Sequence, residues 1–408
     1  MRKDHSDLIG QLEAHLTRER YNSVATHNYA RSAKDFLQYL AQKEIPIDKA
    51  TPADVADHLR CAVRQFRRRH GRRPAPRWES VPQSGIHAML RLAQKRWPPE
   101  PVAVGLGDVL CLAVYNEYQE WLRVHRGLAD KSIYALMWEG RHFLTWYINS
   151  TGALGFTELC VRDIDAYFEL RSRRLRRRSL KDVAERLRSI LRHLHRTGRT
   201  PVDLAPRVVG PTLYAYENIP AALSAQHIST VLKVTRKDHS SMGLRDYAIL
   251  QLLSTYGLRS GEITRLRIED IDWRAEILHV CHWKTSAHSQ LPLMRPVGEA
   301  LLNYLRRGRP QTDVREVFIR ARAPYRRLSG LNPEICRRLE AAGVRPEGKC
   351  GPHIFRHARA VSLLRASVPR KIIGDLLGHR SEEATIPYLK LATEDLRAIA
   401  LEIPEVQS

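Results

Sequence analysis

Residues 246–263 read Asp-Tyr-Ala-Ile-Leu-Gln-Leu-Leu-Ser-Thr-Tyr-Gly-Leu-Arg-Ser-Gly-Glu-Ile, an apolar run followed at once by charged and small residues. The run from Asp246 to Tyr256 predicts a buried helix. Gly257 predicts its end, because glycine readily takes the left-handed conformation that closes a helix. Arg259 and Glu262 come next, separated by about one helical turn. The stretch therefore predicts an arginine and a carboxylate close together at the end of a core helix.

The C-terminal third around this stretch predicts a mainly helical domain with a small antiparallel β-sheet. Residues 277–283 alternate between apolar and polar side chains as a strand does, and residues 290–294 form its expected partner. Residues 284–289 would then form a hairpin loop. Ser224 is the expected N-cap of an earlier helix, and the rest of this third is expected to be helical.

The N-terminal half predicts two helical modules that resemble each other. Apolar residues recur at three- and four-residue intervals between Leu8 and Leu40, and Thr51 followed by Pro52 is typical of a helix start. Two segments are echoed about 107 residues later, 36–40 by 143–147 and 52–55 by 161–164. We interpret the echo as a diverged duplication, with shared amphipathic periodicity as the alternative explanation.

Each module ends in a basic run. Residues 60–99 hold eleven Lys or Arg against the single acid Glu79, and residues 171–199 hold twelve against Asp182 and Glu185. A charged run is usually a solvated face, but two such runs at matching places favour contact with phosphate groups.

The composition of the whole chain agrees with a polyanionic partner. The 408 residues include 67 Lys and Arg against 44 Asp and Glu, which gives a formal net charge of +23 and a pI near 10.1. Such a balance is typical of proteins that bind nucleic acid. With 43% hydrophobic residues the chain can bury real cores, so a charged disordered polymer is excluded.

Other classes of protein find no support in the sequence. No segment has the apolar length of a secretory signal or a membrane span, so we expect a cytoplasmic protein with no membrane partner. The six cysteines form no Cys-x-x-Cys pair and no zinc-type spacing with histidine. The sequence therefore predicts neither a disulfide framework nor a metal site.

Prolines mark two linkers, at residues 97–101 and 201–220, because proline cannot continue a helix. The predicted domains are a helical module at 1–101, a second helical DNA-binding module at 102–205, a linker at 206–219 and a C-terminal domain with its tail at 220–408.

The chain lacks a Walker loop, a dinucleotide-binding glycine cluster and an acidic triad able to hold two magnesium ions. The sequence is still compatible with phosphoryl transfer that uses no metal ion. Such chemistry needs a side-chain nucleophile, fixed cations around the phosphorus, and groups that move protons to and from the attacking and departing oxygens.

Four segments of the C-terminal third hold these residue types: Thr255-Tyr-Gly-Leu-Arg259-Ser-Gly-Glu262-Ile, His282-Trp-Lys284-Thr, Gly351-Pro-His353-Ile-Phe-Arg356-His357, and Leu376-Leu-Gly-His379 followed by Tyr388. Arg259 precedes Lys284 by 25 residues, and His379 lies 23 residues after Arg356 and 9 before Tyr388. The order and spacing resemble the active-site signature of the tyrosine recombinase (phage integrase) family, which is Arg, Lys, His-x-x-Arg, His or Trp, and Tyr.

The resemblance implies a nucleophile and an electrostatic clamp. Tyr388 would attack the scissile phosphate and form a 3'-phosphotyrosyl link, which stores the bond energy without ATP. Arg259 and Arg356 would bracket the nonbridging oxygens with planar, permanently charged forks.

The resemblance also implies the proton-handling groups. His379 would donate a hydrogen bond to the phosphate, and His353 would assist proton transfer at the tyrosine. Lys284 would protonate the departing 5'-oxygen. Glu262 would orient the arginines or His353 from behind. The loop after Lys284 lacks the second basic residue that many relatives have soon after this lysine.

The family resemblance covers about residues 220–395, and residues 105–205 are similar in character to its helical core-binding domain. It implies a site-specific recombinase that clamps duplex DNA, works as a tetramer on two DNA sites, and needs no cofactor and no metal. Residues 1–101 would be a second core-binding-like unit or an arm-type DNA-binding unit. The protein would be bacterial, cytoplasmic and nucleoid-associated.

Two other functions stay open at this point. One is a type IB topoisomerase, which shares the chemistry but relaxes DNA without exchanging partners. The other is a DNA-binding protein that keeps the fold without the activity. Within the recombinases, a phage, transposon, integron or chromosome-resolution role is equally compatible with the sequence, and so is any DNA target. The tail from Glu394 would dock as a helix on a neighbouring protomer or on its own domain.

Overall fold

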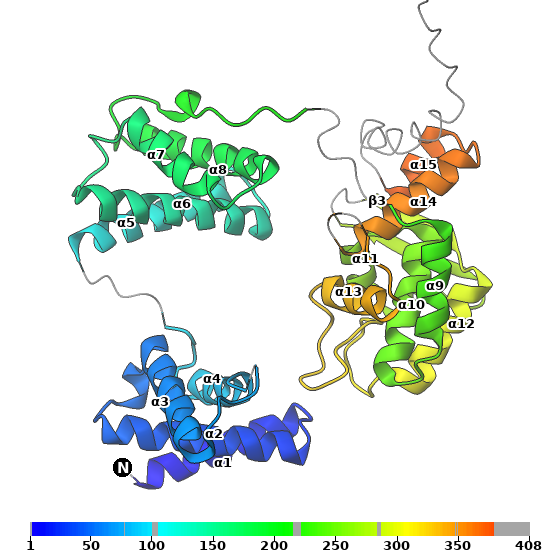
Figure 1. Ribbon diagram of the computed structural model, residues 1–408, viewed down its shortest axis with the longest axis horizontal. Helices are drawn as coiled ribbons and strands as arrows, with labels where there is room; N and C mark the ends of the chain where they lie inside the picture. Colours follow the sequence, from blue (N-terminus) through cyan, green and yellow to red (C-terminus); the bar gives the residue numbers. More distant parts are fainter. Residues whose placement is uncertain are drawn as a thin grey trace, which may run out of the picture. The chain divides into compact units, whose positions relative to one another are not determined.

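The computed structural model describes residues 2–76, 78–99, 105–214, 222–283, 287–346, 348 and 350–378. Within them the chain is mainly helical with one small antiparallel sheet, so the predicted fold class is confirmed. The chain divides into two compact units, one of Glu100–Glu217 and one of Met1–Pro99 with Asn218–Ser408 (Figure 1). The described residues hold three large hydrophobic cores, built from residues 12–97, 111–208 and 223–358. The predicted domain boundaries stay predictions.

The first core is enclosed by four helices, α1 (Arg2–Arg18), α2 (Ser23–Gln42), α3 (Pro52–His70) and α4 (Ser80–Gln94). The predicted apolar residues face inward, with Leu12, Phe36 and Leu40 at most 2% exposed. Gly85 lets α4 approach α2 closely, because a Cβ there would lie 2.8 Å from the Tyr29 backbone.

The second core is enclosed by α5 (Leu106–Glu120), α6 (Asp130–Thr151), α7 (Val161–Ser172) and α8 (Arg177–Arg196), with a π-turn at Trp121–His125. Phe143 and Tyr147 of α6 are buried, as their echo of the first module predicts. Helix α8 buries an apolar stripe, and several of its arginines lie on the opposite, exposed side.

The two modules start their third helices with the same device. In α3 the carboxylate of Asp54 accepts a hydrogen bond from the N-cap Thr51 backbone N–H at 2.8 Å. In α7 Asp163 accepts from the Cys160 N–H at 2.9 Å. Such an acidic N3 residue satisfies an N–H that the helix leaves open. The shared order of four helices and this shared cap support the predicted duplication, which stays a prediction.

The third core belongs to the C-terminal domain. Its helices are α9 (Ala225–Arg236), α10 (Ser241–Tyr256), α11 (Ser260–Arg265), α12 (Arg295–Asn303), α13 (Asn332–Ala341), α14 (His353–Arg365) and α15 (Arg370–Leu377). Its strands are β1 (Ile271–Asp272), β2 (Ile277–His282) and β3 (Ala287–Pro292), paired antiparallel in the order β1-β2-β3. Short 3₁₀ or π turns are at Ile47–Lys49, Ala205–Arg207, Ile268–Asp270 and Tyr304–Gly308.

Helix α10 runs through the middle of this domain. Ile249, Leu250, Leu252 and Leu253 are all 0% exposed, so the helix is covered on every side, as the continuous apolar run predicts. It ends at Gly257 in the left-handed conformation, with φ +68° and an N–H bonded to the Leu253 carbonyl. The end of α10 therefore fixes the direction in which the backbone continues to Arg259.

A buried carboxylate ties α10 to α13. Asp246 is 0% exposed and accepts from Arg245 Nε and Nη2 at 3.0 and 2.9 Å. Its second oxygen accepts from Arg338 Nε and Arg337 Nη2, both at 2.8 Å. Every lone-pair direction of this carboxylate thus meets a charged donor, which is the condition for a stable buried charge.

Three details of the C-terminal domain differ from the sequence predictions. Strand β3 begins at Ala287, earlier than expected, so it pairs with β2 over its whole length. Strand β1 was not predicted because a two-residue strand carries no alternation pattern. The expectation that the rest of this third is helical is wrong for residues 309–331, since this segment is irregular, with isolated bridges between Arg267 and Glu316 and between Ile319 and Arg327. Its prolines 310 and 324 account for that.

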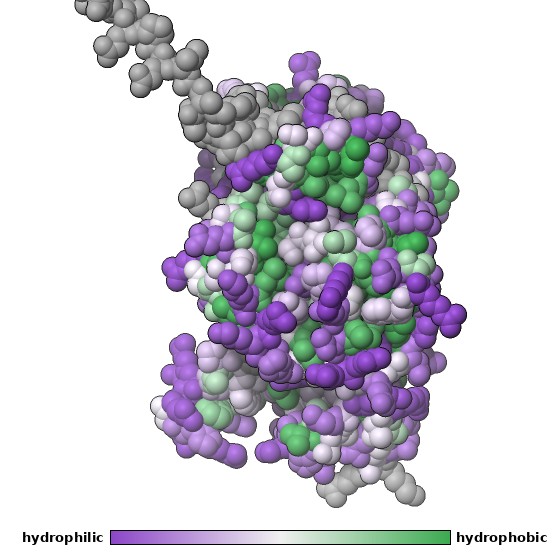
Figure 2. All heavy atoms as spheres, turned by 90° about the vertical axis from the view of Figure 1, so that its right-hand side faces the viewer, coloured by the Kyte–Doolittle hydropathy of each residue, from purple (hydrophilic) through white to green (hydrophobic). Residues whose placement is uncertain are grey.

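Hydrophilic side chains cover most of the face that Figure 2 shows, with apolar patches between them. None of the helices in the described ranges is both long and apolar enough to cross a membrane.

Candidate active site

Arg259 lies at the junction of α10 and α11, where it is the N-cap residue of α11. Its backbone N–H donates to Glu262 Oε2 at 2.7 Å, and its Nη1 donates to Glu262 Oε1 at 2.9 Å. Its Nη2 donates to the Gly378 carbonyl at 3.0 Å. The side chain is 21% exposed, so the guanidinium is held from behind and still reaches solvent.

Arg356 is the second fixed cation. It lies on α14 and is 3% exposed. Its Nη1 donates to the Gly257 carbonyl at 2.9 Å, and its Nη2 donates to the Leu377 carbonyl. Arg356 therefore joins the end of α10 to the end of α15. The carbonyls at a helix C-terminus carry partial negative charge, which stabilises a guanidinium there.

Glu262 holds the first arginine from inside the domain. Burial raises its pKa, but hydrogen bonds from His282 and from the Arg259 backbone lower it further than burial raises it. The net shift is downward, so the carboxylate stays ionised at neutral pH. His282 Nδ1 lies 2.7 Å from Glu262 Oε1. Because an ionised carboxylate only accepts, Nδ1 carries the proton in this contact.

His282 is a site residue that the sequence prediction missed. The sequence presents it only as a neighbour of Lys284, yet it is 0% exposed and touches Glu262. The alternation along β2 could have indicated that it points inward, because Leu278, Val280 and His282 share the buried face.

His353 is the first residue of α14 and is exposed. It lies one turn before Arg356, and its ring centroid is 6.2 Å from that of His357. Burial, with electrostatic effects of the neighbouring His353 and Arg356, lowers the pKa of His357 to about 4. His357 is therefore neutral at pH 7, and His353 is the one of the two that faces solvent.

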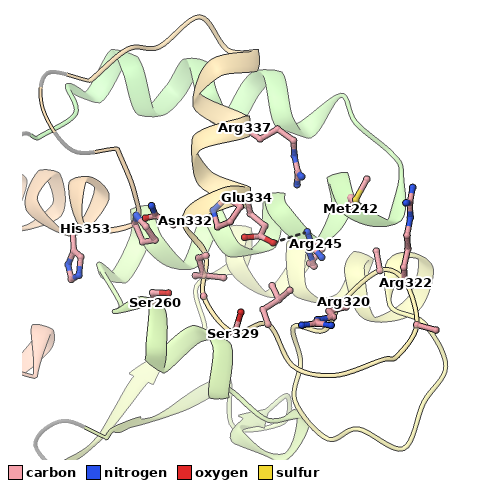
Figure 3. Close-up of a pocket in the computed structure, with 17 residues that line it drawn as sticks. Met242, Arg245, Ser260, Arg320, Arg322, Ser329, Asn332, Glu334, Arg337 and His353 are labelled. Atoms are coloured by element: carbon pink, nitrogen blue, oxygen red, sulfur yellow. Dashed lines mark ion pairs between the residues drawn. The ribbon is translucent and has the colours of Figure 1, made fainter. Parts of the chain in front are cut away.

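A cavity of about 750 Å³ opens beside His353 (Figure 3). Ser260, the neighbour of Arg259, lines it on the same side, and the figure shows Arg320 and Arg322 at the far end. Both arginines are exposed. Arg245 and Glu334 meet in the wall at 3.8 Å. The cavity is thus lined by several cations and few acids, which suits an anionic ligand.

The structure brings together three of the predicted site residues, Arg259, Glu262 and Arg356, and places His353 on the same helix as Arg356. The other three, Lys284, His379 and Tyr388, lie outside the described residues. Two described residues immediately precede predicted ones. Trp283, before Lys284, is 63% exposed with Arg265 over its ring, and Gly378, before His379, receives the Arg259 hydrogen bond. In the part of the chain that the structure describes, no three His, Cys, Asp or Glu gather as metal ligands would.

Chemically, this arrangement is a fixed pair of guanidiniums backed by a carboxylate. Arg259 uses two of its five guanidinium N–H groups on Glu262 and Gly378, so other N–H groups can reach a tetrahedral oxyanion. Planar arginine forks match phosphate oxygens well. The site is therefore suited to binding a phosphate group.

Comparison with known proteins gives a consistent result. The model of the phage integrase family matches residues 222–395. An integrase/recombinase of Sinorhizobium fredii, y4rA, is 30% identical over 392 residues, which cover 94% of this chain and 91% of the relative. A second from the same organism, y4gC, is 64% identical over 186 residues, covering 46% of this chain and 97% of the relative. The tyrosine recombinase XerA of Pyrococcus furiosus is 30% identical over 182 residues, 44% of this chain and 61% of the relative.

Solved structures share the fold. The XerH site-specific recombinase in a post-cleavage complex with a palindromic difH substrate aligns with a TM-score of 0.56, at 15% identity, over 72% of this chain and 87% of its own. A lambda integrase dimer bound to a COC' core site aligns with a TM-score of 0.54, at 17% identity, over 72% of this chain and 99% of its own.

Proposed function

Because the chain belongs to the phage integrase family of tyrosine recombinases, we propose that it cleaves and rejoins duplex DNA at specific sites through a 3'-phosphotyrosyl intermediate, with no ATP and no metal ion. The observation that carries the proposal is the pair of arginines. Arg259 and Arg356 donate to the consecutive carbonyls of Gly378 and Leu377, so both charges lie at one helix end. Two permanent positive charges this close can stabilise a pentacoordinate phosphorane.

The proposed reaction balances without a co-reactant. The Tyr388 oxygen forms a bond to the scissile phosphorus, the bond to the 5'-oxygen breaks, and Lys284 gives that oxygen a proton. His353 takes the proton of the tyrosine, and His379 donates a hydrogen bond to the phosphate. Rejoining is the reverse with a new 5'-hydroxyl. Glu262 keeps Arg259 in place throughout.

The DNA strand next to the scissile phosphate would pass over the cavity beside His353. The exposed Arg320 and Arg322 line it, and the backbone of DNA presents an anion at every nucleotide. The basic sides of the two helical modules would add further phosphate contacts, since exposed arginines crowd the end of α3 and both ends of α8.

Strand exchange needs two DNA sites and more than one protomer. Solved relatives of the same fold include a lambda integrase tetramer bound to a Holliday junction, with a TM-score of 0.54 to this chain. We therefore include duplex DNA as the substrate and a tetramer on two sites as the working assembly in the proposal. The tail proposed to join protomers lies outside the described residues.

The test uses a DNA duplex with a nick near the cleavage site, so that the short strand diffuses away after attack and the covalent adduct accumulates. Wild-type protein should give a protein–DNA adduct on a denaturing gel, in excess EDTA as well as in magnesium. Tyr388→Phe removes only the attacking oxygen, so it should bind DNA and give no adduct. An adduct with Tyr388→Phe would disprove the nucleophile, and strict magnesium dependence would disprove the metal-free reaction.

A further inference from the structure

His282, a buried side chain at the end of strand β2, connects this strand to the proposed active site. It is 0% exposed. Its Nδ1 lies 2.7 Å from Glu262 Oε1, and its Nε2 lies 2.9 Å from the Ser289 hydroxyl on β3. Nδ1 donates to the carboxylate, and Nε2 shares a hydrogen bond with the Ser289 hydroxyl. Both ring nitrogens thus have partners, which offsets the cost of burying them.

The same ring also lies directly against Gly378. A Cβ added to Gly378 would come 2.5 Å from His282 Nδ1 and 2.6 Å from its Cγ. Gly378 has a left-handed φ of +60°, which also favours glycine. The imidazole therefore sets how closely the end of α15 approaches β2.

These two contacts converge on Arg259. Glu262 accepts hydrogen bonds from the Arg259 backbone and guanidinium, and Gly378 accepts the other guanidinium bond. His282 touches both of these partners. It is therefore in contact with both of the acceptors that orient the Arg259 guanidinium.

We propose that His282 is a positioning residue for Arg259, acting through the hydrogen bond to Glu262 and the packing against Gly378. The inference rests on the proposed function for its kinetic readout. His282 also lies two residues before Lys284 in the chain. Its hydrogen bond to Glu262 therefore anchors the end of β2, from which the chain continues to Lys284, to the same carboxylate that holds Arg259.

Two substitutions separate the hydrogen bond from mere filling of space. His282→Asn puts an amide N–H close to the place of Nδ1, so it keeps a donor toward Glu262. His282→Gln puts its amide N–H near the place of Nε2, toward Ser289. The matched control is His279→Gln, a histidine on the same strand whose side chain is on the other face. Thermal unfolding checks that all three variants are folded.

The first measurement is the single-turnover cleavage rate on the nicked duplex at saturating protein. We expect His282→Gln to cleave about 10- to 100-fold more slowly with unchanged DNA affinity, because a displaced guanidinium misses the transition state. His282→Asn should stay within about 3-fold of wild type, and His279→Gln should not change the rate.

The second measurement replaces the scissile phosphate by an uncharged methylphosphonate. Such a substrate has one negative charge less to stabilise, so a defect that acts through an arginine should shrink. We expect the ratio of wild-type to His282→Gln rates to be clearly smaller on this substrate. An equal ratio on both substrates would mean that the residue only supports the fold, and it would overturn the proposal.

The third measurement needs no catalysis. The backbone N–H of Arg259 donates a hydrogen bond to Glu262. Hydrogen exchange of the peptide that contains Arg259–Leu266 therefore reports directly whether this contact is kept. It should exchange faster in His282→Gln than in His282→Asn. Equal protection in both would overturn the proposal. If wild-type protein gives no adduct at all, the proposed function fails, and the exchange result still decides the role of His282.

Discussion

Arg259 and Arg356 donate to consecutive carbonyls at the end of α15, Arg259 to Gly378 at 3.0 Å and Arg356 to Leu377. The two residues reach this helix end from different places, Arg259 from the N-cap of α11 and Arg356 from α14. Two like charges come this close without large cost because the helix end and Glu262 offset them. Contacts within the domain therefore already hold both arginines of the proposed phosphate site in place.

The first prediction concerns the shape of this clamp. Arg259→Lys keeps the charge but offers a single ammonium where a fork now meets Glu262 and Gly378. We expect adduct formation to fall by at least about 100-fold. The control is Arg295→Lys, at a side chain that is 90% exposed on α12, which should keep its rate. A mild defect in Arg259→Lys, similar to the control, would argue that only charge matters.

The second prediction concerns stability. Asp246→Ala removes the carboxylate that accepts from Arg245, Arg337 and Arg338, of which Arg245 and Arg338 are buried. Breaking a buried ion pair by deleting one partner costs about 3–5 kcal/mol of unfolding free energy. Glu269→Ala, which removes exposed surface pairs with Arg267 and Arg315, should cost much less, because solvent screens such pairs. Urea unfolding of both variants gives the comparison, and equal losses would contradict it.

The sequence predicted those parts of the site that are local in the chain. Arg259 and Glu262 lie within one turn, so their contact follows from spacing. The Gly378 carbonyl is 119 residues from Arg259, and no local pattern encodes that distance. Likewise, alternation along β2 indicates that His282 is buried but not that it meets Glu262. Such contacts depend on how α11, β2 and α15 pack.

The irregular segment 309–331 shows a different limit. The expectation that the rest of the C-terminal third is helical included this segment, but its backbone is shaped by prolines and by isolated bridges such as that between Ile319 and Arg327. Arg320 and Arg322 of this irregular segment line the cavity. A general expectation of helix does not predict such a path of the backbone, which depends on turn residues.

The third prediction concerns acid sensitivity of the second module. His193 is 2% exposed and packs against the rings of Tyr118 and Trp121, and its ring nitrogens have no hydrogen-bond partner among the described residues. Burial, with help from Arg196 and Arg199, lowers its pKa to about 4.

The unfolded chain binds this proton more readily, near an ordinary pKa of about 6.5. Stability from this group is therefore complete above pH 6.5 and is lost as the pH falls from there to about 4. His193→Phe should make the unit Glu100–Glu217 less sensitive over this range. Hydrogen exchange of α8 peptides at several pH values measures it, and an unchanged pH slope would show that the histidine does not titrate on unfolding.

The fourth prediction concerns the cavity beside His353. Arg322→Ala removes one exposed guanidinium from its wall. If it contacts a DNA phosphate, the slope of log affinity against log salt should become shallower by about 0.9. Arg295→Ala, outside the cavity, should leave the slope unchanged. Equal slopes for both variants would remove the cavity from the proposed DNA path.

The last prediction concerns residues 1–101. The run 60–99 carries eleven basic residues against one acid, and Arg64, Arg67, Arg68 and Arg69 of α3 are exposed. If this module grips DNA by itself, a chain that begins at Val102 should show a shallower salt slope than the full chain, by about 0.9 for each ionic contact removed. It should still form the Tyr388 adduct on a short DNA site, because all proposed catalytic residues lie beyond residue 255.

The two readouts separate three roles for this module. A shallower slope with intact cleavage identifies an independent DNA grip, which the basic end of α3 favours. An unchanged slope means that the arginines of α3 face solvent or another protein, and it would contradict the prediction. Loss of cleavage in a truncated chain that still unfolds cooperatively would mean that the C-terminal domain needs the first module. In that case the predicted boundary near residue 101 is wrong, since Met1–Pro99 and Asn218–Ser408 would then form one functional as well as one compact unit.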